Sequence, residues 1–434
     1  MSSSWLPTWR LNTSGGVVAP EERLPMGQTC AMGLQHVVAM FGSTVLGPLL
    51  MGFDTNVAIL MSGIGTLIFF FIVGGRVPSY LGSSFAFIGV VSAVTGYVGH
   101  GPNPNIPLAL GGIIACGAVY MLVGFIVHLV GANWIERFMP PIVTGAIVAV
   151  IGLNLALVPI KNMAPSIHAD PSSQFDVWVQ AITFLCISCI AVFTRGMLRR
   201  LLILVGLIVS YFIYLAITNG LGWGKPIDFS GVAAASWLGM PNFSAPRFEF
   251  NAMMLIIPVV VILVAENLGH IKAVSAMTGK DLSPYMGRAF IGDGIATMVS
   301  GSVGGTGVTT YAENIGVMAA TKIYSTLMFV VAALFAIILG FSPKFGALIQ
   351  TIPVAVMGGV SIVVFGLIAV SGAKIWVDNK VDFSKNSNLM IAAIVLILGT
   401  GDYTVQLGTL TLNGIGTSTF VAILLNALLN RKED

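Results

Sequence analysis

Charged residues are scarce in this chain. Only 9% of its 434 residues are Asp, Glu, Lys or Arg, whereas 56% are hydrophobic. Soluble domains carry about 25% charged residues, so this composition excludes an ordinary soluble protein. The apolar residues form runs of about 17 to 24 residues, each long enough to cross a bilayer. The sequence therefore predicts an all-α polytopic membrane protein surrounded by lipid, and we expect no nucleic-acid partner.

Cysteine is rare too, and the patterns of common active sites are missing. Cys186 and Cys189 form a C-x-x-C inside an apolar run without a second pair, which favours plain packing residues. Neither a metal-ligand spacing nor a Ser–His–Asp set is present. The glycine-rich stretch 301–307 lacks the Gly-Lys-Ser/Thr of a phosphate loop. We therefore expect neither an enzyme nor a metal site, and no cofactor apart from a proton as coupling ion.

Hydropathy and turn residues predict fourteen membrane segments. The third and the tenth are short and interrupted. The approximate ranges are 28–49, 56–74, 83–99, 107–130, 140–157, 177–195, 200–219, 251–271, 288–303, 306–322, 324–341, 352–371, 388–401 and 413–430.

The placement of Lys and Arg sets the orientation. With a cytoplasmic N-terminus, sixteen of the twenty basic residues fall in cytoplasmic loops or termini, as the positive-inside rule requires. The four that fall outside are Lys161, Lys225, Arg247 and Lys344. One miscounted segment would invert every later loop, so we predict that both termini are cytoplasmic.

Two features predict an internal repeat. Pro140–Gly145 in the fifth segment is similar to Pro353–Gly358 in the twelfth, and the interrupted third and tenth segments are also seven apart. A seven-segment unit repeated once must insert upside down the second time. Paired interrupted segments at equivalent places in inverted halves indicate the binding site of a transporter.

We expect the tenth segment to form one wall of that binding site. Four of the seven residues from Gly301 to Gly307 are glycine, which opposes a helix, and a short helix follows over about 312–322. Irregular backbone survives at membrane depth only in contact with protein or a water-filled cavity. Glu313 stands at the start of this short helix, where a carboxylate is costly unless it has a function.

Glu266 is the second candidate acid, after seven apolar residues in the eighth segment, and His270 lies one turn further on the same face. Each central charge costs about 2.5–3.5 kcal/mol unless a partner, protonation or a cavity offsets it. A protonated carboxyl group avoids this cost, which makes these acids candidate proton carriers. The alternative is a polar network that only holds helices together.

The interrupted segments also predict the ligand. Residues 83–87 and 309–313 precede two short helices whose N-terminal ends offer unpaired N–H donors. With two carboxyl groups nearby, the site offers donors and acceptors to a small, planar, neutral molecule such as a nucleobase. An inorganic anion would be repelled by Glu266 and Glu313 when either is ionised.

Three further polar residues could either contact the ligand or make structural contacts. Gln35 and His36 lie in the first segment, where a lone His either links helices or contacts the ligand, and both interpretations stay open. Asp293 lies near the start of the ninth segment, and we expect a contact at a helix end or in a loop.

Three motifs together resemble one known family. Glu313-Asn314-Ile-Gly316, followed by Thr321-Lys322, is similar to the signature of the nucleobase–ascorbate transporter (nucleobase:cation symporter-2) family. Gln35-His36 resembles its first-segment motif, and residues 80–87 resemble its third-segment sequence. Glutamate at the first signature position looks like the uracil-type members, whereas xanthine-type members typically carry glutamine.

The resemblance implies a seven-plus-seven inverted repeat with a core and a gate domain, and a homodimer formed through the gate. It implies proton-coupled import of uracil or a close pyrimidine by alternating access in the bacterial inner membrane. The alternatives are a xanthine or purine permease of the family and, more remotely, an anion exchanger of related architecture. The implied parts are a tail at 1–27, core at 28–130 and 251–341, gate at 131–219 and 342–434, and an outer linker at 220–250.

The resemblance also implies roles for individual residues. Glu266 and Glu313 would hydrogen-bond the base, and His270 would assist through water and proton coupling. Substrate contacts would come from Phe85, Tyr311, Ala312 and Phe365, with support from Gln35, His36, Ser84 and Asn314. Two positions depart from the family, because Ala312 replaces a usual glycine and Phe365 replaces an expected tyrosine.

Overall fold

The structure is a computed structural model. It describes residues 5–13, 16–97, 101–156, 159, 171–196, 198, 201–407 and 410–429. It consists of two compact units, each made of two stretches of chain. Unit 1 comprises Met1–Ala132 and Val232–Ile349, and unit 2 comprises Asn133–Gly231 and Gln350–Asp434. Lys161, which the charge pattern assigns to the outer side, lies outside the described residues.

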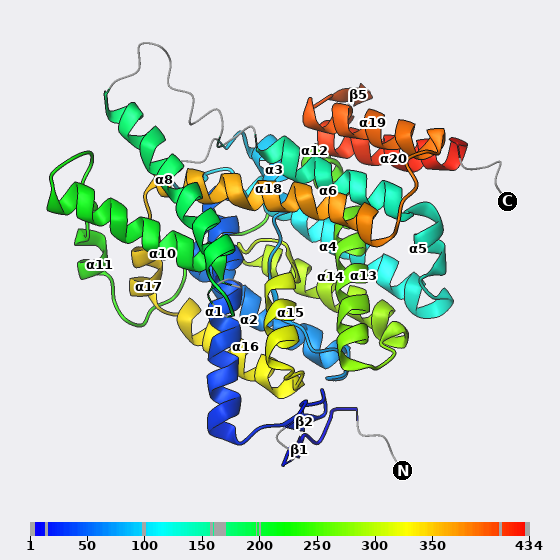
Figure 1. Ribbon diagram of the computed structural model, residues 1–434, viewed down its shortest axis with the longest axis horizontal. Helices are drawn as coiled ribbons and strands as arrows, with labels where there is room; N and C mark the ends of the chain where they lie inside the picture. Colours follow the sequence, from blue (N-terminus) through cyan, green and yellow to red (C-terminus); the bar gives the residue numbers. More distant parts are fainter. Residues whose placement is uncertain are drawn as a thin grey trace. The chain divides into compact units, whose positions relative to one another are not determined.

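Helices dominate unit 1, with two short strand pairs (Figure 1). The strands are β1 Arg10–Leu11, β2 Glu22–Arg23, β3 Leu81–Ser83 and β4 Val308–Thr310. The helices are α1 Met26–Met51, α2 Thr55–Ile72, α3 Phe87–Thr95, α4 Ile106–Val130, α12 Phe250–Ile256, α13 Val259–Thr278, α14 Met286–Ser302, α15 Ala312–Thr321, α16 Thr326–Gly340 and α17 Pro343–Gln350, with a 3-10 turn at Ser283–Tyr285.

Unit 2 is helical as well, apart from one hairpin. Its helices are α5 Asn133–Phe138, α6 Pro141–Leu155, α8 Pro171–Phe193, α10 Leu202–Leu215, a π-helical turn at Ala216–Gly220, α18 Val354–Asp378, α19 Asn386–Thr400 and α20 Gly414–Leu429. The strands β5 Val405–Leu407 and β6 Leu410–Leu412 pair antiparallel. Helix α11, Ser230–Ala234, contains the point in the sequence where the chain passes from unit 2 to unit 1.

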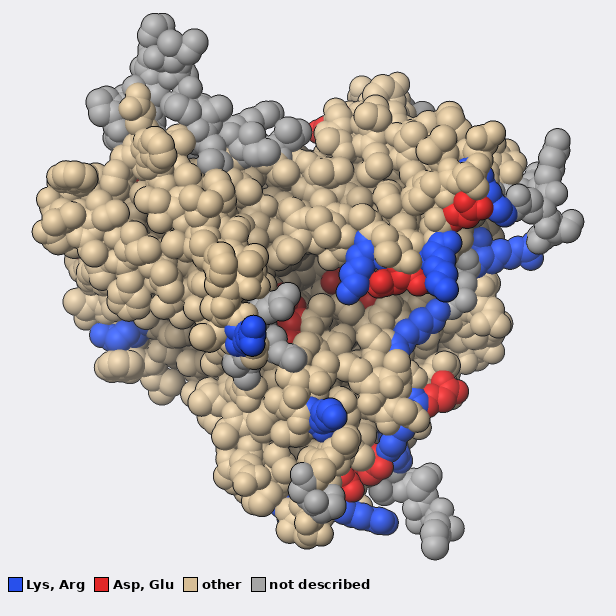
Figure 2. Space-filling view, in the orientation of Figure 1, with Lys and Arg blue, Asp and Glu red and all other residues tan. Residues whose placement is uncertain are grey.

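The helices account for a multi-pass membrane protein. Among the described residues, seven are long and apolar enough to cross a bilayer, or eight if α16 and α17, bent by 80°, form one span. Shorter apolar helices are α6, α19 and α20. Figure 2 shows one face of the protein with broad areas that carry no charged side chain. A count of fourteen spans stays a prediction.

Helices α4 and α14 pack closely because small residues face each other. A Cβ placed on Gly117 would lie 2.8 Å from the carbonyl oxygen of Gly294, and one on Gly294 would lie 2.7 Å from that of Gly117. Small residues that let backbones approach are the usual means of helix association in lipid. The close approach brings α14, with its one acidic residue, against α4.

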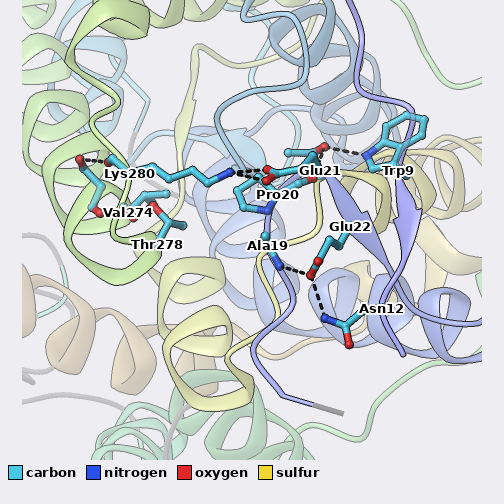
Figure 3. A network of polar contacts seen from close by, with 11 residues as sticks. Trp9, Asn12, Ala19, Pro20, Glu21, Glu22, Val274, Thr278 and Lys280 are labelled. Carbon is cyan, nitrogen blue, oxygen red and sulfur yellow. Dashed lines mark hydrogen bonds and ion pairs between the residues drawn. The ribbon is translucent and has the colours of Figure 1, made fainter. Parts of the chain in front are cut away.

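The N-terminal segment is folded onto unit 1 (Figure 3). Val18 is 2% exposed and pairs its backbone with that of Ile323, just after α15. The indole N–H of Trp9 donates to Thr326 Oγ1 at 2.9 Å, and Lys280 Nζ lies 2.6 Å from Glu21 Oε1. The segment therefore connects the ends of α13 and α15 with the start of α16.

A second acid in this segment organises its turn. Glu22 Oε2 accepts hydrogen bonds from the backbone N–H of Ala19 at 3.0 Å and from Asn12 Nδ2 at 2.8 Å. These donors hold the pKa of Glu22 below its usual value, because they stabilise the carboxylate. The sequence predicted only a polar tail here.

Candidate functional site

Two extended segments meet inside unit 1. Strands β3 and β4 pair antiparallel, with Gly82 opposite Thr309, and every residue of both strands is buried. Two positions in and beside these strands require glycine, because neighbouring side chains lie directly against the backbone there. A Cβ on Gly82 would lie 2.5 Å from Tyr311 Cζ, and one on Gly307 would lie 2.2 Å from Phe87 Cε2. Irregular backbone is thus satisfied by a short ladder instead of by a helix.

Each strand leads into a short helix. After β3 the chain turns through Ser84 and Phe85 into α3, and after β4 it passes through Tyr311 into α15. Ser84 is buried and its backbone N–H donates to the carbonyl of Gly307 at 2.9 Å. Phe85 is half-buried, while Ala312 at the start of α15 is exposed. Glu313 lies in the first turn of α15, where the helix dipole favours a carboxylate.

Helix α1 holds α15 at several levels. Asn314 Nδ2 donates to the backbone carbonyl of His36 at 3.0 Å and also lies 3.0 Å from His36 Nδ1. Two turns further along α1, the Ser43 hydroxyl donates to Glu313 Oε1. These contacts fix the direction of α15, and Figure 1 shows the two helices adjacent to each other.

Thr44, next along α1, completes this contact. Its hydroxyl donates to the Tyr311 hydroxyl at 3.0 Å, which in turn donates to the carbonyl of Ser83 at 2.9 Å. All three residues are buried. Tyr311 therefore links α1 to the strand pair directly before Glu313.

The second carboxyl group comes from α13. Glu266 is half-buried, and Thr309 Oγ1 lies 3.5 Å from its Oε2. His270, also half-buried, places Nδ1 2.8 Å from Thr310 Oγ1. Glu313 acts electrostatically on Glu266. Adjacent residues of β4 therefore contact Glu266 and His270 of α13. The site brings together two acids, one imidazole and two hydroxyl groups.

The position expected for Asp293 is wrong. It lies in the middle of α14, fully buried, because this helix begins at Met286 and runs to Ser302 against α4. Asn267 Nδ2 donates to Asp293 Oδ2 at 2.5 Å and lies 3.0 Å from the Tyr120 hydroxyl. Asn267 Oδ1 is 3.5 Å from Thr310 Oγ1. A chain of polar contacts thus runs from His270 through Thr310 and Asn267 to a third, buried acid.

Sequence reasoning missed Asp293, Asn267 and Tyr120 as a group. The available signal was an acid within a glycine-rich apolar run and an asparagine directly after Glu266. Their partnership depends on the packing of three helices.

Other candidates lie further from this cluster or in unit 2. His36 is completely buried, with Asn314 as its partner, which favours a role in linking helices. Gln35 is half-buried beside it in α1. Phe365 belongs to α18 of unit 2 and is 2% exposed, so unit 1 alone does not include it. Within the described residues no group of three His, Cys, Asp or Glu could hold a metal ion.

The structure thus has helices long enough to span a membrane and a buried strand pair, with Glu266 in contact with β4 and Glu313 at the start of the helix that follows it. A family model described as "Permease family" matches residues 27–408. The chain therefore belongs to the nucleobase–ascorbate transporter family of permeases, and it is not an enzyme.

Relatives are similar over nearly their whole length. The chain is 64% identical over 435 residues to the "Putative pyrimidine permease RutG" of Escherichia coli (strain K12), covering 100% of this chain and 97% of that protein. It is 42% identical to the "Uracil permease" of Paenibacillus larvae, covering 95% and 97%. The "Uracil permease" of Escherichia coli (strain K12) is 39% identical, covering 94% and 92%.

Solved structures share the fold at much lower identity. The transmembrane domain of the cyanobacterial bicarbonate transporter BicA matches with a TM-score of 0.62 and 14% identity, covering 92% of this chain and 97% of that one. The murine anion transporter Slc26a9 matches with a TM-score of 0.67 and 13% identity, covering 95% and 69%. At such identities the likeness concerns the fold alone.

Proposed function

We propose that this protein is a proton-coupled symporter that imports uracil or a closely related pyrimidine across the bacterial inner membrane. The observation that carries the proposal is that Glu266 contacts Thr309 of β4 and that Glu313 lies in the first turn of the helix after β4, bonded to Ser43, with both acids half-buried. The names of the relatives support a pyrimidine as substrate.

The edge of the base fits this arrangement. Uracil carries one N–H, at N3, between two carbonyl groups and another, at N1, beside one of them. Carboxylate oxygens of Glu266 and Glu313 would accept from the N–H groups, and backbone N–H groups near Phe85 and Ala312 would donate to the carbonyls, since the first N–H groups of a helix lack intrahelical partners. His270 would act through water. Tyr311 would support the site through the hydrogen bond that its hydroxyl donates to the Ser83 carbonyl.

Proton coupling follows from the cost of charge. Glu266 and Glu313 are half-buried and Asp293 is fully buried, so keeping all three carboxyl groups ionised at membrane depth would be costly. Binding a proton would remove one charge and let the loaded carrier reorient through the membrane. Release to the cytoplasm would restore the empty state.

Alternating access would use the two units. Unit 1 would act as the core that holds the substrate, and unit 2 would act as the gate. Fourteen spans in a seven-plus-seven inverted repeat, both termini in the cytoplasm and a homodimer formed through the gate are parts of the same proposal.

A purine or xanthine permease is the second candidate, because the family model includes xanthine permeases. Glutamate at position 313 favours the pyrimidine. The similarity in fold to anion and bicarbonate transporters would also allow an anion exchanger. Among the described residues, however, the contacts of Glu266 and Glu313 include no Lys or Arg.

Uptake into proteoliposomes tests the proposal. With an inward proton gradient, uracil should accumulate above its outside concentration, and uracil flux that is indifferent to the gradient would refute proton coupling. Glu313→Gln should weaken uracil binding by about tenfold or more, since a hydrogen bond to a charged group contributes about 1.5–3 kcal/mol. Residual transport should shift toward purines.

Glu249→Gln is the matched control, because Glu249 is a partly exposed carboxylate paired with Arg247 in the linker before α12. It should transport uracil normally. Unchanged uracil uptake by Glu313→Gln would remove Glu313 from the site.

A further inference from the structure

Ser43 differs from those buried hydroxyl residues of the membrane helices that bond within their own helix. Ser361 donates to the carbonyl of Met357 at 2.7 Å, and Thr183 donates to that of Val179 at 2.8 Å, so each satisfies itself within its own helix. Ser43 is 2% exposed and instead donates across to Glu313 Oε1 on α15. A buried hydroxyl that forgoes its local acceptor in this way has a specific partner.

Other residues of α1 hold the chain on either side of Glu313. His36 holds Asn314, directly after Glu313, and Thr44 holds Tyr311, two residues before it. Deleting the Ser43 hydroxyl therefore leaves α15 attached at two points. What changes is the number of acceptor positions that the Glu313 carboxylate offers to a ligand.

An ionised carboxylate offers about four acceptor positions, two on each oxygen, and can accept two parallel N–H donors from one ligand edge. Ser43 uses one of the positions on Oε1, so fewer positions remain for a ligand edge that needs both oxygens at once. Uracil and thymine each present one N–H, at N3, between two carbonyl groups, and a second, at N1, beside one of them. Guanine presents a ring N–H beside an amino group, which is a pair of adjacent donors that needs both oxygens.

We propose that Ser43 is a specificity-determining residue that occupies one acceptor position on Oε1 of Glu313 and thereby selects bases with a single N–H between carbonyl groups over bases with two adjacent donors. This inference rests on the proposed function, because it takes Glu313 as a ligand of the base. Ser43 itself is a positioning residue, since it acts through Glu313.

Binding by the purified full-length protein in lipid nanodiscs tests the inference, with uracil, thymine and guanine as probes in calorimetric titrations. Ser43→Ala and Ser43→Cys both remove the strong donor, and the cysteine keeps the size of the side chain. In both variants we expect uracil and thymine to bind about tenfold more weakly. The ratio of guanine to uracil affinity should rise by about tenfold or more, and Ser43→Thr should restore the wild-type ratio.

Ser418→Ala is the control, because Ser418 is equally buried and its hydroxyl donates only to Ile415 in its own helix. It should bind all three bases like the wild type. If Ser43→Ala and Ser43→Cys keep both the uracil affinity and the guanine ratio of the wild type, the inference is wrong. If the wild type binds none of the bases, the proposed function fails first, and the two failures are thereby distinguished.

Discussion

Replacing Gly82 with alanine is the sharpest test of how the site is built. The new Cβ would lie 2.5 Å from Tyr311 Cζ and 2.6 Å from Thr44 Oγ1, whereas ordinary contacts lie at 3.4–4 Å. Neither neighbour can swing away freely, because Thr44 donates to the Tyr311 hydroxyl and that hydroxyl donates to Ser83. Relief of the clash therefore requires a shift of about 1 Å in β3 or in the Tyr311 ring.

The cost has two parts. Overpacking a buried position costs about 1–3 kcal/mol. Loss of the two hydrogen bonds of Tyr311 adds about 0.5–1.5 kcal/mol each, so we expect Gly82→Ala to lower the free energy of unfolding by about 2–6 kcal/mol. Glu313 follows Tyr311 by two residues, and a shift of this size in a binding group costs up to about 100-fold. Uracil affinity should fall by about 10- to 100-fold.

Thermal unfolding in nanodiscs and calorimetric titration with uracil measure the two effects. Gly27→Ala serves as control, because a Cβ there meets nothing within 4 Å and Gly27 lies in the first turn of α1. The control should melt at the wild-type temperature or slightly above it. Wild-type stability and wild-type uracil affinity in Gly82→Ala would show that the ladder and Tyr311 do not position Glu313.

Two further predictions concern contacts around the site. Asn267→Ala should lower the free energy of unfolding by about 1–3 kcal/mol, because it leaves the buried Asp293 and Tyr120 without their shared donor. A melting temperature equal to that of the wild type would contradict the chain of contacts to Asp293. Lys280→Ala should lower the free energy of unfolding by at most about 1 kcal/mol, because the side chains of Lys280 and Glu21 are 41% and 44% exposed. A loss well above 2 kcal/mol in the same measurement would show that the N-terminal segment depends on this ion pair.

The sequence predicted the places of the helices because long apolar runs leave few other structures in lipid. Glycines 301–307 predicted an interruption, and the structure has β4 between α14 and α15 there. The pairing of β4 with β3 could not be predicted, since it joins residues more than 220 positions apart. Helix α17 and the β5–β6 hairpin also went unpredicted, as both are short and depend on local turns.

Individual site residues show the limit more clearly. Glu266 and Glu313 stood out because a carboxylate in an apolar run is costly. Ser43 did not, because serine is common in membrane helices and only the fold supplies Glu313 as its partner. Asp293 was assigned to a helix end because a single sequence does not reveal that α4 and α13 bring Tyr120 and Asn267 to the middle of α14.

The partners of the two acids bear on how a carrier of this design would work. Ser43 and Thr309, which contact Glu313 and Glu266, both belong to unit 1, as do Tyr311 and the strand pair behind them. Movement of unit 1 as a body would therefore carry the binding groups along without breaking their hydrogen bonds. Reorientation would then be opposed mainly by the charge of the acids, and a proton together with a neutral base is what reduces that opposition. In the proposed carrier, coupling of substrate to proton would follow from the same two carboxyl groups that would bind the substrate.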